Sequence, residues 1–144
     1  MNERDIAFLP AWQLGRLIKT KEISPVELTE LYIRRIEEFN PALNAFITIA
    51  ADYAIREAKL AEIKITNNDI TSALFGVPIG IKDLELTSGI RSTMGSLVYQ
   101  NYIPELKQYI PFHSLPNRIS LWQKISLFCL SNCEELVWVT HRER

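Results

Sequence analysis

A lysine at the end of a short apolar segment is the residue best placed for chemistry in this chain. Residues 75–83 read Phe-Gly-Val-Pro-Ile-Gly-Ile-Lys-Asp. The alternation of branched with other residues predicts a strand over 77–82, with Lys82 on the face opposite to Ile81. Burial lowers the pKa of a lysine, and only a neutral amine can accept a proton from a serine. Lys82 is therefore a candidate catalytic base, and a solvated surface charge is the alternative.

Two glycines lie within this segment. Gly76 and Gly80 carry no side chains, so another backbone or a ligand can come close to the strand. This arrangement is typical of a pocket wall.

Three helices are expected before the strand. The first should run from about Ala11 to Lys19. The second should begin at Ser24, because Ser24 and Glu27 form a capping box and Pro25 occupies the first helical position.

The second helix should end at Asn40-Pro41. A short strand over 44–49 should follow. Ala54, Ala58, Ala61 and Ile65 then form the apolar stripe of a third helix, with Asp52 near its start. We expect the apolar stripes of all three helices to pack in the core.

Longer motifs resemble those of the amidase signature family, which comprises serine hydrolases with a Ser-Ser-Lys triad. Residues 75–83 are similar to that family's Gly-Val-Pro-(Ile/Leu)-x-(Ile/Val)-Lys-Asp segment, and residues 84–96 and 102–105 continue the likeness in the same order. Upstream, the resemblance includes Asn40-Pro41 and Asn44-Ala45-Phe46, and it covers about residues 5–105. It implies an α/β fold, here the N-terminal helices and first strands of a mixed sheet flanked by helices, incomplete in this chain.

The resemblance also implies a mechanism. Lys82 matches the triad lysine, which accepts a proton from a bridging serine while that serine deprotonates the nucleophilic serine. The two serines belong to a downstream segment of the type Gly-Gly-Ser-Ser-Gly-Gly, which this chain lacks. Ser88, Ser92 and Ser96 lie too near Lys82 in sequence to match them, and we expect turn hydroxyls there. The family needs no cofactor or metal; its substrate is a small-molecule amide, and partner subunits are implied if the chain is amidotransferase-like.

Composition changes after about Glu105. All five glycines precede residue 96, whereas both cysteines and both histidines follow residue 112. Residues 1–105 thus form the N-terminal part of an amidase domain and 106–144 a divergent tail, which reflects either a domain boundary or translation in a shifted frame. Codons compatible with residues 137–144, read one base later, can spell Phe-Gly-Ser-His-Thr-Glu-Asn, similar to a segment of the family.

Taken as it stands, the tail has further interpretations. Cys129, Cys133 and His141 have spacing too loose to favour a zinc site. Residues 120–138 are compatible with an amphipathic or buried helix, interrupted by Glu134 and Glu135 and too short to span a bilayer.

The whole chain has the bulk properties of a cytoplasmic globular protein. A formal net charge of −1 gives no footprint for nucleic acid or a membrane surface. Two functions remain: part of an amidase, inactive here without its serines, or a non-catalytic partner-binding remnant or pseudogene product. An unfinished sheet predicts marginal stability for the chain alone.

Overall fold

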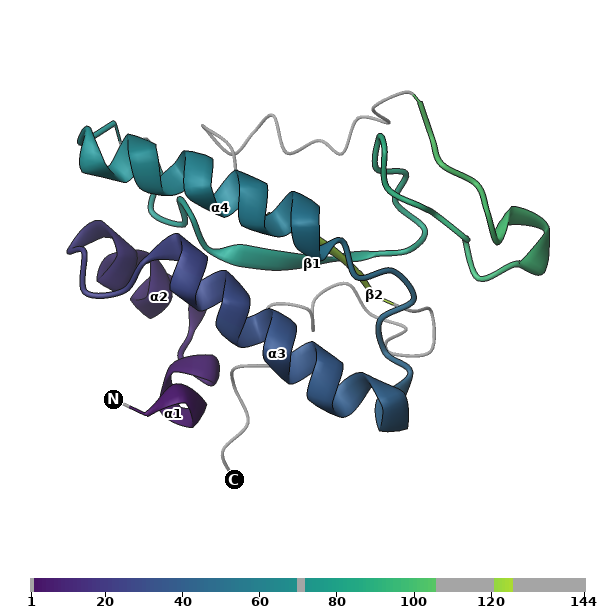
Figure 1. Cartoon of the computed structure of the whole chain (residues 1–144), viewed down its shortest axis with the longest axis horizontal. Coiled ribbons are helices and arrows are strands. Elements are labelled where there is room, and N and C mark those ends of the chain that lie inside the picture. Colours follow the sequence, from purple (N-terminus) through teal and green to yellow (C-terminus); the bar gives the residue numbers. More distant parts are fainter. Residues whose placement is uncertain (1, 70–71, 106–120, 126–144) are drawn as a thin grey trace.

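The computed structural model describes residues 2–69, 72–105 and 121–125 (Figure 1). Within these ranges, helices precede a pair of strands. The helices are α1 (Glu3–Ala7), α2 (Ala11–Lys19), α3 (Pro25–Leu43) and α4 (Ala51–Thr66); they are followed by β1 (Pro78–Lys82), the short 3-10 helix η1 (Leu97–Tyr99) and β2 (Leu121–Ile125). Helices and strands together confirm the predicted α/β class.

The expected starts of the helices agree closely with the structure. Helix α2 has the bounds expected from the sequence. Ser24 is the N-cap of α3, where its Oγ accepts a hydrogen bond from Val26 N–H (3.0 Å) and its own N–H donates to Glu27 Oε2 (3.1 Å). The Ser24 hydroxyl also donates to Glu62 Oε1 of α4 (2.5 Å), so one serine both begins α3 and joins it to α4.

The expected end of α3 at Asn40-Pro41 is wrong, because the helix continues to Leu43. Pro41 lies in the last turn, where its missing N–H removes only one helical hydrogen bond. The helical bonding continues beyond it, since Asn44 N–H bonds to Asn40 O at 2.7 Å. Asn44 then ends the helix in the left-handed region (φ 49°), which asparagine tolerates better than most residues.

The expected strand over 44–49 is also wrong: only an isolated bridge at Thr48 occurs there. The Asn40 side chain donates to Phe46 O (3.0 Å) and accepts from Phe46 N–H (2.8 Å). Arg91 Nη2 donates to Ile47 O. Side chains thus occupy the backbone groups that a strand would offer to a neighbour, and the segment forms a loop.

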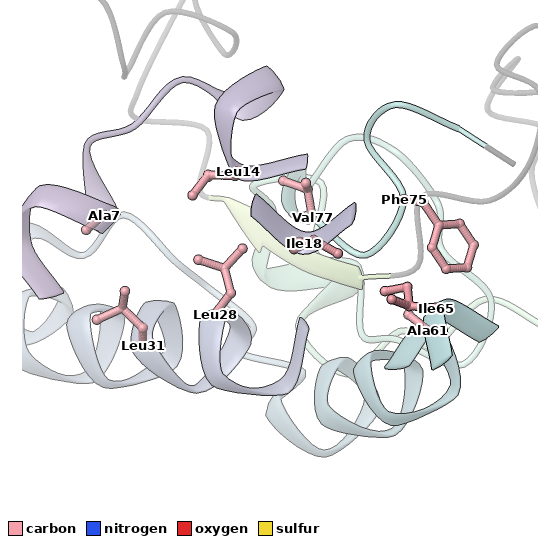
Figure 2. Packing of buried hydrophobic residues seen from close by; sticks show 9 residues of the cluster. All are labelled: Ala7, Leu14, Ile18, Leu28, Leu31, Ala61, Ile65, Phe75 and Val77. Carbon is pink, nitrogen blue, oxygen red and sulfur yellow. The ribbon is translucent and has the colours of Figure 1, made fainter. Parts of the chain in front are cut away.

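Helices α2, α3 and α4 share one apolar core with the segment that leads into β1 (Figure 2). Ile18 and Leu28 are almost completely buried at its centre. All four residues of the predicted third stripe are buried on α4, as expected. Figure 2 shows nine side chains of this cluster: Ala7, Leu14, Ile18, Leu28, Leu31, Ala61, Ile65, Phe75 and Val77.

Two glycines permit close packing around this core. A Cβ on Gly15 of α2 would lie 2.1 Å from Ala73 O, so only glycine lets α2 approach the segment before β1 this closely. Gly76 has φ +81°, and a Cβ there would lie 3.1 Å from Pro25 Cγ. The close approach expected at Gly76 is thus made by helix α3.

Strands β1 and β2 pair in parallel, with Pro78 opposite Leu121 and Lys82 opposite Ile125. The expected strand over 77–82 is confirmed with a start one residue later. The helix expected over 120–138 is wrong for residues 121–125. These residues form strand β2, because pairing with β1 gives their backbone groups partners in a sheet. Residues 126–144, and with them the zinc candidates Cys129, Cys133 and His141, lie outside the described residues.

No helix in the described ranges is long and apolar enough to cross a membrane.

Candidate functional site

Lys82 is the last residue of β1, between two buried neighbours. Ile81 is buried, Asp83 is completely buried, and Lys82 is half-buried. Successive residues of a strand point to opposite faces, so Ile81 points into the protein and Lys82 points away from it. The burial of Asp83, the first residue after β1, shows that its side chain also lies inside the protein. Among the described residues, the Lys82 ammonium forms no hydrogen bond or ion pair. The predicted face of the lysine is therefore as expected, and its role stays a prediction.

Asp83 is the structural centre of the site, a role that the sequence analysis did not assign. Its carboxylate accepts hydrogen bonds from Thr93 N–H (3.0 and 3.1 Å to the two oxygens), Thr93 Oγ1 (2.6 Å) and Gly95 N–H (3.3 Å). Hydrogen bonds to an ionised acceptor are about twice as strong as neutral ones. Asp83 thereby attaches the turn at 93–95 to the residue that follows Lys82. No local sequence signal pairs residues ten positions apart in this way.

The turn held by Asp83 is conformationally unusual. Met94 has φ 50° and Gly95 has φ 69°. Glycine adopts such angles freely, whereas a methionine there is strained. Because Asp83 bonds to the residues on both sides of Met94, its carboxylate stabilises this conformation.

The serines near Lys82 form hydrogen bonds to backbone groups. Ser88 Oγ donates to Glu105 O (3.0 Å), and Ser96 Oγ accepts from Val98 N–H (3.3 Å) at the start of η1. Ser92 is completely buried and donates to Ile90 O (3.2 Å). The bonds of Ser92 and Ser96 are of the kind expected for turn hydroxyls, whereas the bond of Ser88 joins two segments that are distant in sequence.

Arg91 joins three segments around the site. Its guanidinium donates to Ile47 O and to Gln100 O (3.1 Å), and its own carbonyl accepts from Thr48 Oγ1 (3.4 Å). The loop before α4 and the segment after η1 are therefore both fixed relative to the turn that Asp83 holds.

Shifted pKa values among the described residues fall on the helices. Burial raises the pKa of Tyr32, whose hydroxyl donates to Ala7 O (3.2 Å) and so joins α3 to α1. Burial also raises the pKa of Tyr53, and the Glu57 carboxylate raises it further. Neither tyrosine belongs to the turn beside Lys82.

No group of three or more His, Cys, Asp or Glu side chains that could hold a metal ion occurs in the described part of the chain.

Known proteins similar to this chain are amidases and amidotransferase subunits. The sequence profile of the Amidase family matches residues 27–108. The A subunit of glutamyl-tRNA(Gln) amidotransferase from Geotalea daltonii is 44% identical over 92 residues, which are 64% of this chain and 19% of that protein. The corresponding protein of Anaplasma phagocytophilum is 33% identical over 125 residues, 87% of this chain and 25% of that protein.

A solved structure shares the fold. A bacterial aryl acylamidase of the amidase signature enzymes family superposes with a TM-score of 0.70 and 28% identity, over 82% of this chain and 25% of the acylamidase. The chain thus spans about a fifth to a quarter of the length of the proteins it matches. Because the family profile covers more than half of its residues, and its α/β fold agrees, the chain belongs to the amidase family.

Proposed function

We propose that this chain is the part of an amidase that carries the lysine of a Ser-Ser-Lys triad, and that it does not hydrolyse amides without the two serines. The observation that supports this most directly is the position of Lys82. It is half-buried at the end of β1, and the fully buried Asp83 beside it is bound to the neighbouring turn.

In the proposed reaction, Lys82 Nζ in its neutral form accepts a proton from a bridging serine. That serine in turn takes the proton of the nucleophilic serine, whose Oγ attacks the carbonyl carbon of a carboxylic amide. The amine leaves with a proton, and water or another acceptor then takes the acyl group from the serine. This chain contains no Gly-Gly-Ser-Ser-Gly-Gly segment, so both serines must be supplied by sequence that it does not contain.

The tail after Glu105 is relevant to where the segment with the two serines is encoded. We infer that residues 106–144 include translation in a shifted frame, as their composition suggests. The Anaplasma alignment is longer than the 105 residues before the change, so part of the tail still aligns with a relative. Sequencing the coding DNA through the Glu105 codon and past Arg144 tests this inference. A shifted frame that continues into Gly-Gly-Ser-Ser-Gly-Gly would support it, and its absence from every frame would favour a non-catalytic, partner-binding product.

The catalytic role of Lys82 is tested in the protein encoded by the restored frame, or in the intact Geotalea relative at its aligned lysine. Lys82→Met should lower kcat for a simple carboxylic amide by about 100-fold to 10,000-fold, the usual contribution of a general base. Lys59→Met changes an exposed lysine on α4 and is the matched control. Unchanged kcat in the Lys82 variant, or amide hydrolysis by the present chain alone, would contradict the proposal.

A second candidate within the same class is the amide-handling component of a tRNA-dependent amidotransferase. It is favoured by the curated relatives, which are glutamyl-tRNA(Gln) amidotransferase A subunits. Such a component would work together with partner subunits and pass ammonia on instead of releasing it. Copurification of partner subunits with the restored protein would distinguish it from a free-standing amidase.

A further inference from the structure

The segment 96–103, called here the apolar arm, projects from the helices and strands and is drawn in green in Figure 1. It reads Ser-Leu-Val-Tyr-Gln-Asn-Tyr-Ile and contains no charged residue. Leu97 and Val98 are each 85% exposed. The other apolar side chains of the arm, Tyr99, Tyr102 and Ile103, are each at least 40% exposed.

Hydrogen bonds fix the arm at its base. Ser92 N–H donates to Tyr102 O (2.9 Å), Gly89 N–H donates to Pro104 O (3.0 Å), and Arg91 Nη1 donates to Gln100 O. The rings of Tyr99 and Tyr102 pack edge to face, with centroids 5.9 Å apart. The apolar side chains are thus presented to solvent on an ordered backbone.

Such a surface fits an apolar protein partner. Contiguous exposed apolar side chains on an ordered segment mark an interaction surface, whereas single exposed hydrophobics need no explanation. Segments that bind a membrane surface combine an apolar face with Lys and Arg. The arm contains no Lys or Arg. The absence of charge also offers nothing to a nucleic acid.

Lengths of the relatives indicate which protein covers the arm. The arm lies inside the region matched by the Amidase profile, so relatives have a counterpart of it. These relatives are four to five times longer than the part that this chain matches. We propose that the apolar arm is the docking surface for the remainder of the amidase domain, that is, for polypeptide corresponding to the part of the relatives that this chain does not cover.

Cysteine labelling tests this proposal. Val98→Cys is placed in the full 144-residue chain, and maleimide labelling is measured by peptide mass spectrometry, which separates this site from Cys129 and Cys133. The site should be labelled rapidly in the chain alone. It should be protected at least about tenfold when the chain is co-expressed with the part of the Geotalea relative outside its aligned 92 residues. Glu38→Cys, at an exposed position of α3, is the control that stays labelled.

The intact Geotalea relative supplies a second measurement that does not require two pieces to associate. A cysteine at the position aligned with Val98 should be protected there, and rapid labelling would overturn the proposal. Protection in this chain alone that grows with its concentration would instead assign the arm to a second copy. Protection by phosphatidylcholine vesicles would assign it to a membrane, and either result would also overturn the proposal.

The labelling reports burial and not amide hydrolysis. In the intact Geotalea relative, replacing the lysine aligned with Lys82 by methionine should therefore lower kcat while the cysteine aligned with Val98 stays protected. The docking proposal and the proposed function can thus be refuted separately.

Discussion

Replacing Asp83 with alanine removes the acceptor that holds the turn beside Lys82. Among the described residues, the donors that lose this acceptor include Thr93 N–H, Thr93 Oγ1 and Gly95 N–H. Alanine cannot accept a hydrogen bond through its side chain, and Asp83 is completely buried, so the donors lose their shared acceptor inside the protein. We expect the turn to open and Met94 to leave its left-handed conformation.

The magnitude follows from the geometry of the bonds. A hydrogen bond to a charged group contributes about 1.5–3 kcal/mol. The two bonds from Thr93 are short, whereas Gly95 N–H lies 3.3 Å from the carboxylate and equally far from Thr93 Oγ1, so we count only two full bonds. Their loss costs about 3–6 kcal/mol. At about 1.4 kcal/mol for each factor of ten, the open form should become at least about 100 times more populated.

Amide hydrogen exchange measured by mass spectrometry reports that population at Thr93 and Gly95. In the Asp83→Ala chain, both amides should exchange at rates close to those of an unfolded peptide. This holds whether the turn opens locally or the whole chain unfolds, because both processes expose the amides. Glu85→Ala removes an exposed carboxylate two residues away and should leave the exchange unchanged.

Two results would refute this reasoning. Exchange at Thr93 within threefold of the unsubstituted chain would mean that Asp83 does not hold the turn. Unprotected exchange in the unsubstituted chain would mean that the hydrogen bonds to Asp83 are not stable in solution.

The other predictions concern stability, measured by urea unfolding unless stated otherwise. Gly15→Ala should lower the free energy of unfolding by about 3 kcal/mol, because the new Cβ meets a backbone oxygen. Gly89→Ala, at φ +75° in open space, should lower it by about 1–2 kcal/mol from backbone strain alone. Equal losses would contradict the steric argument. Ser24→Ala should cost about 1–2 kcal/mol through the loss of the α3 cap, and a cost within error of zero would show that the cap is unimportant. Because burial raises the pKa of Tyr32, the unfolded chain loses this proton first; stability should therefore fall as pH rises above about 10, and a Tyr32→Phe chain that loses as much stability would refute this. The unsubstituted chain itself should melt broadly, and a sharp cooperative transition would contradict marginal stability.

Local rules predicted the parts of the fold that depend on neighbouring residues. The α2 bounds, the Ser24 cap and the α4 stripe each follow from residues a few positions apart. The same holds for the strand that carries Lys82, since its alternation is visible over six residues.

Contacts between distant segments account for what the sequence did not predict. The segment 44–50 is a loop because Asn40 and Arg91 bind its backbone, and Arg91 is more than forty residues away. Strand β2 exists through its pairing with β1, which no local pattern specifies. Asp83 was visible only as one letter of a motif, and its partners became known from the structure.

The alternation at the end of β1 has a consequence for insertions and deletions. Ile81 and Asp83 point inward and Lys82 points outward, so one residue added or lost between Ile79 and Lys82 would exchange the two faces. The amine would then enter the core, and the carboxylate that holds the turn would move to the outside. Length changes in this strand should therefore be eliminated by selection even where many single substitutions are accepted.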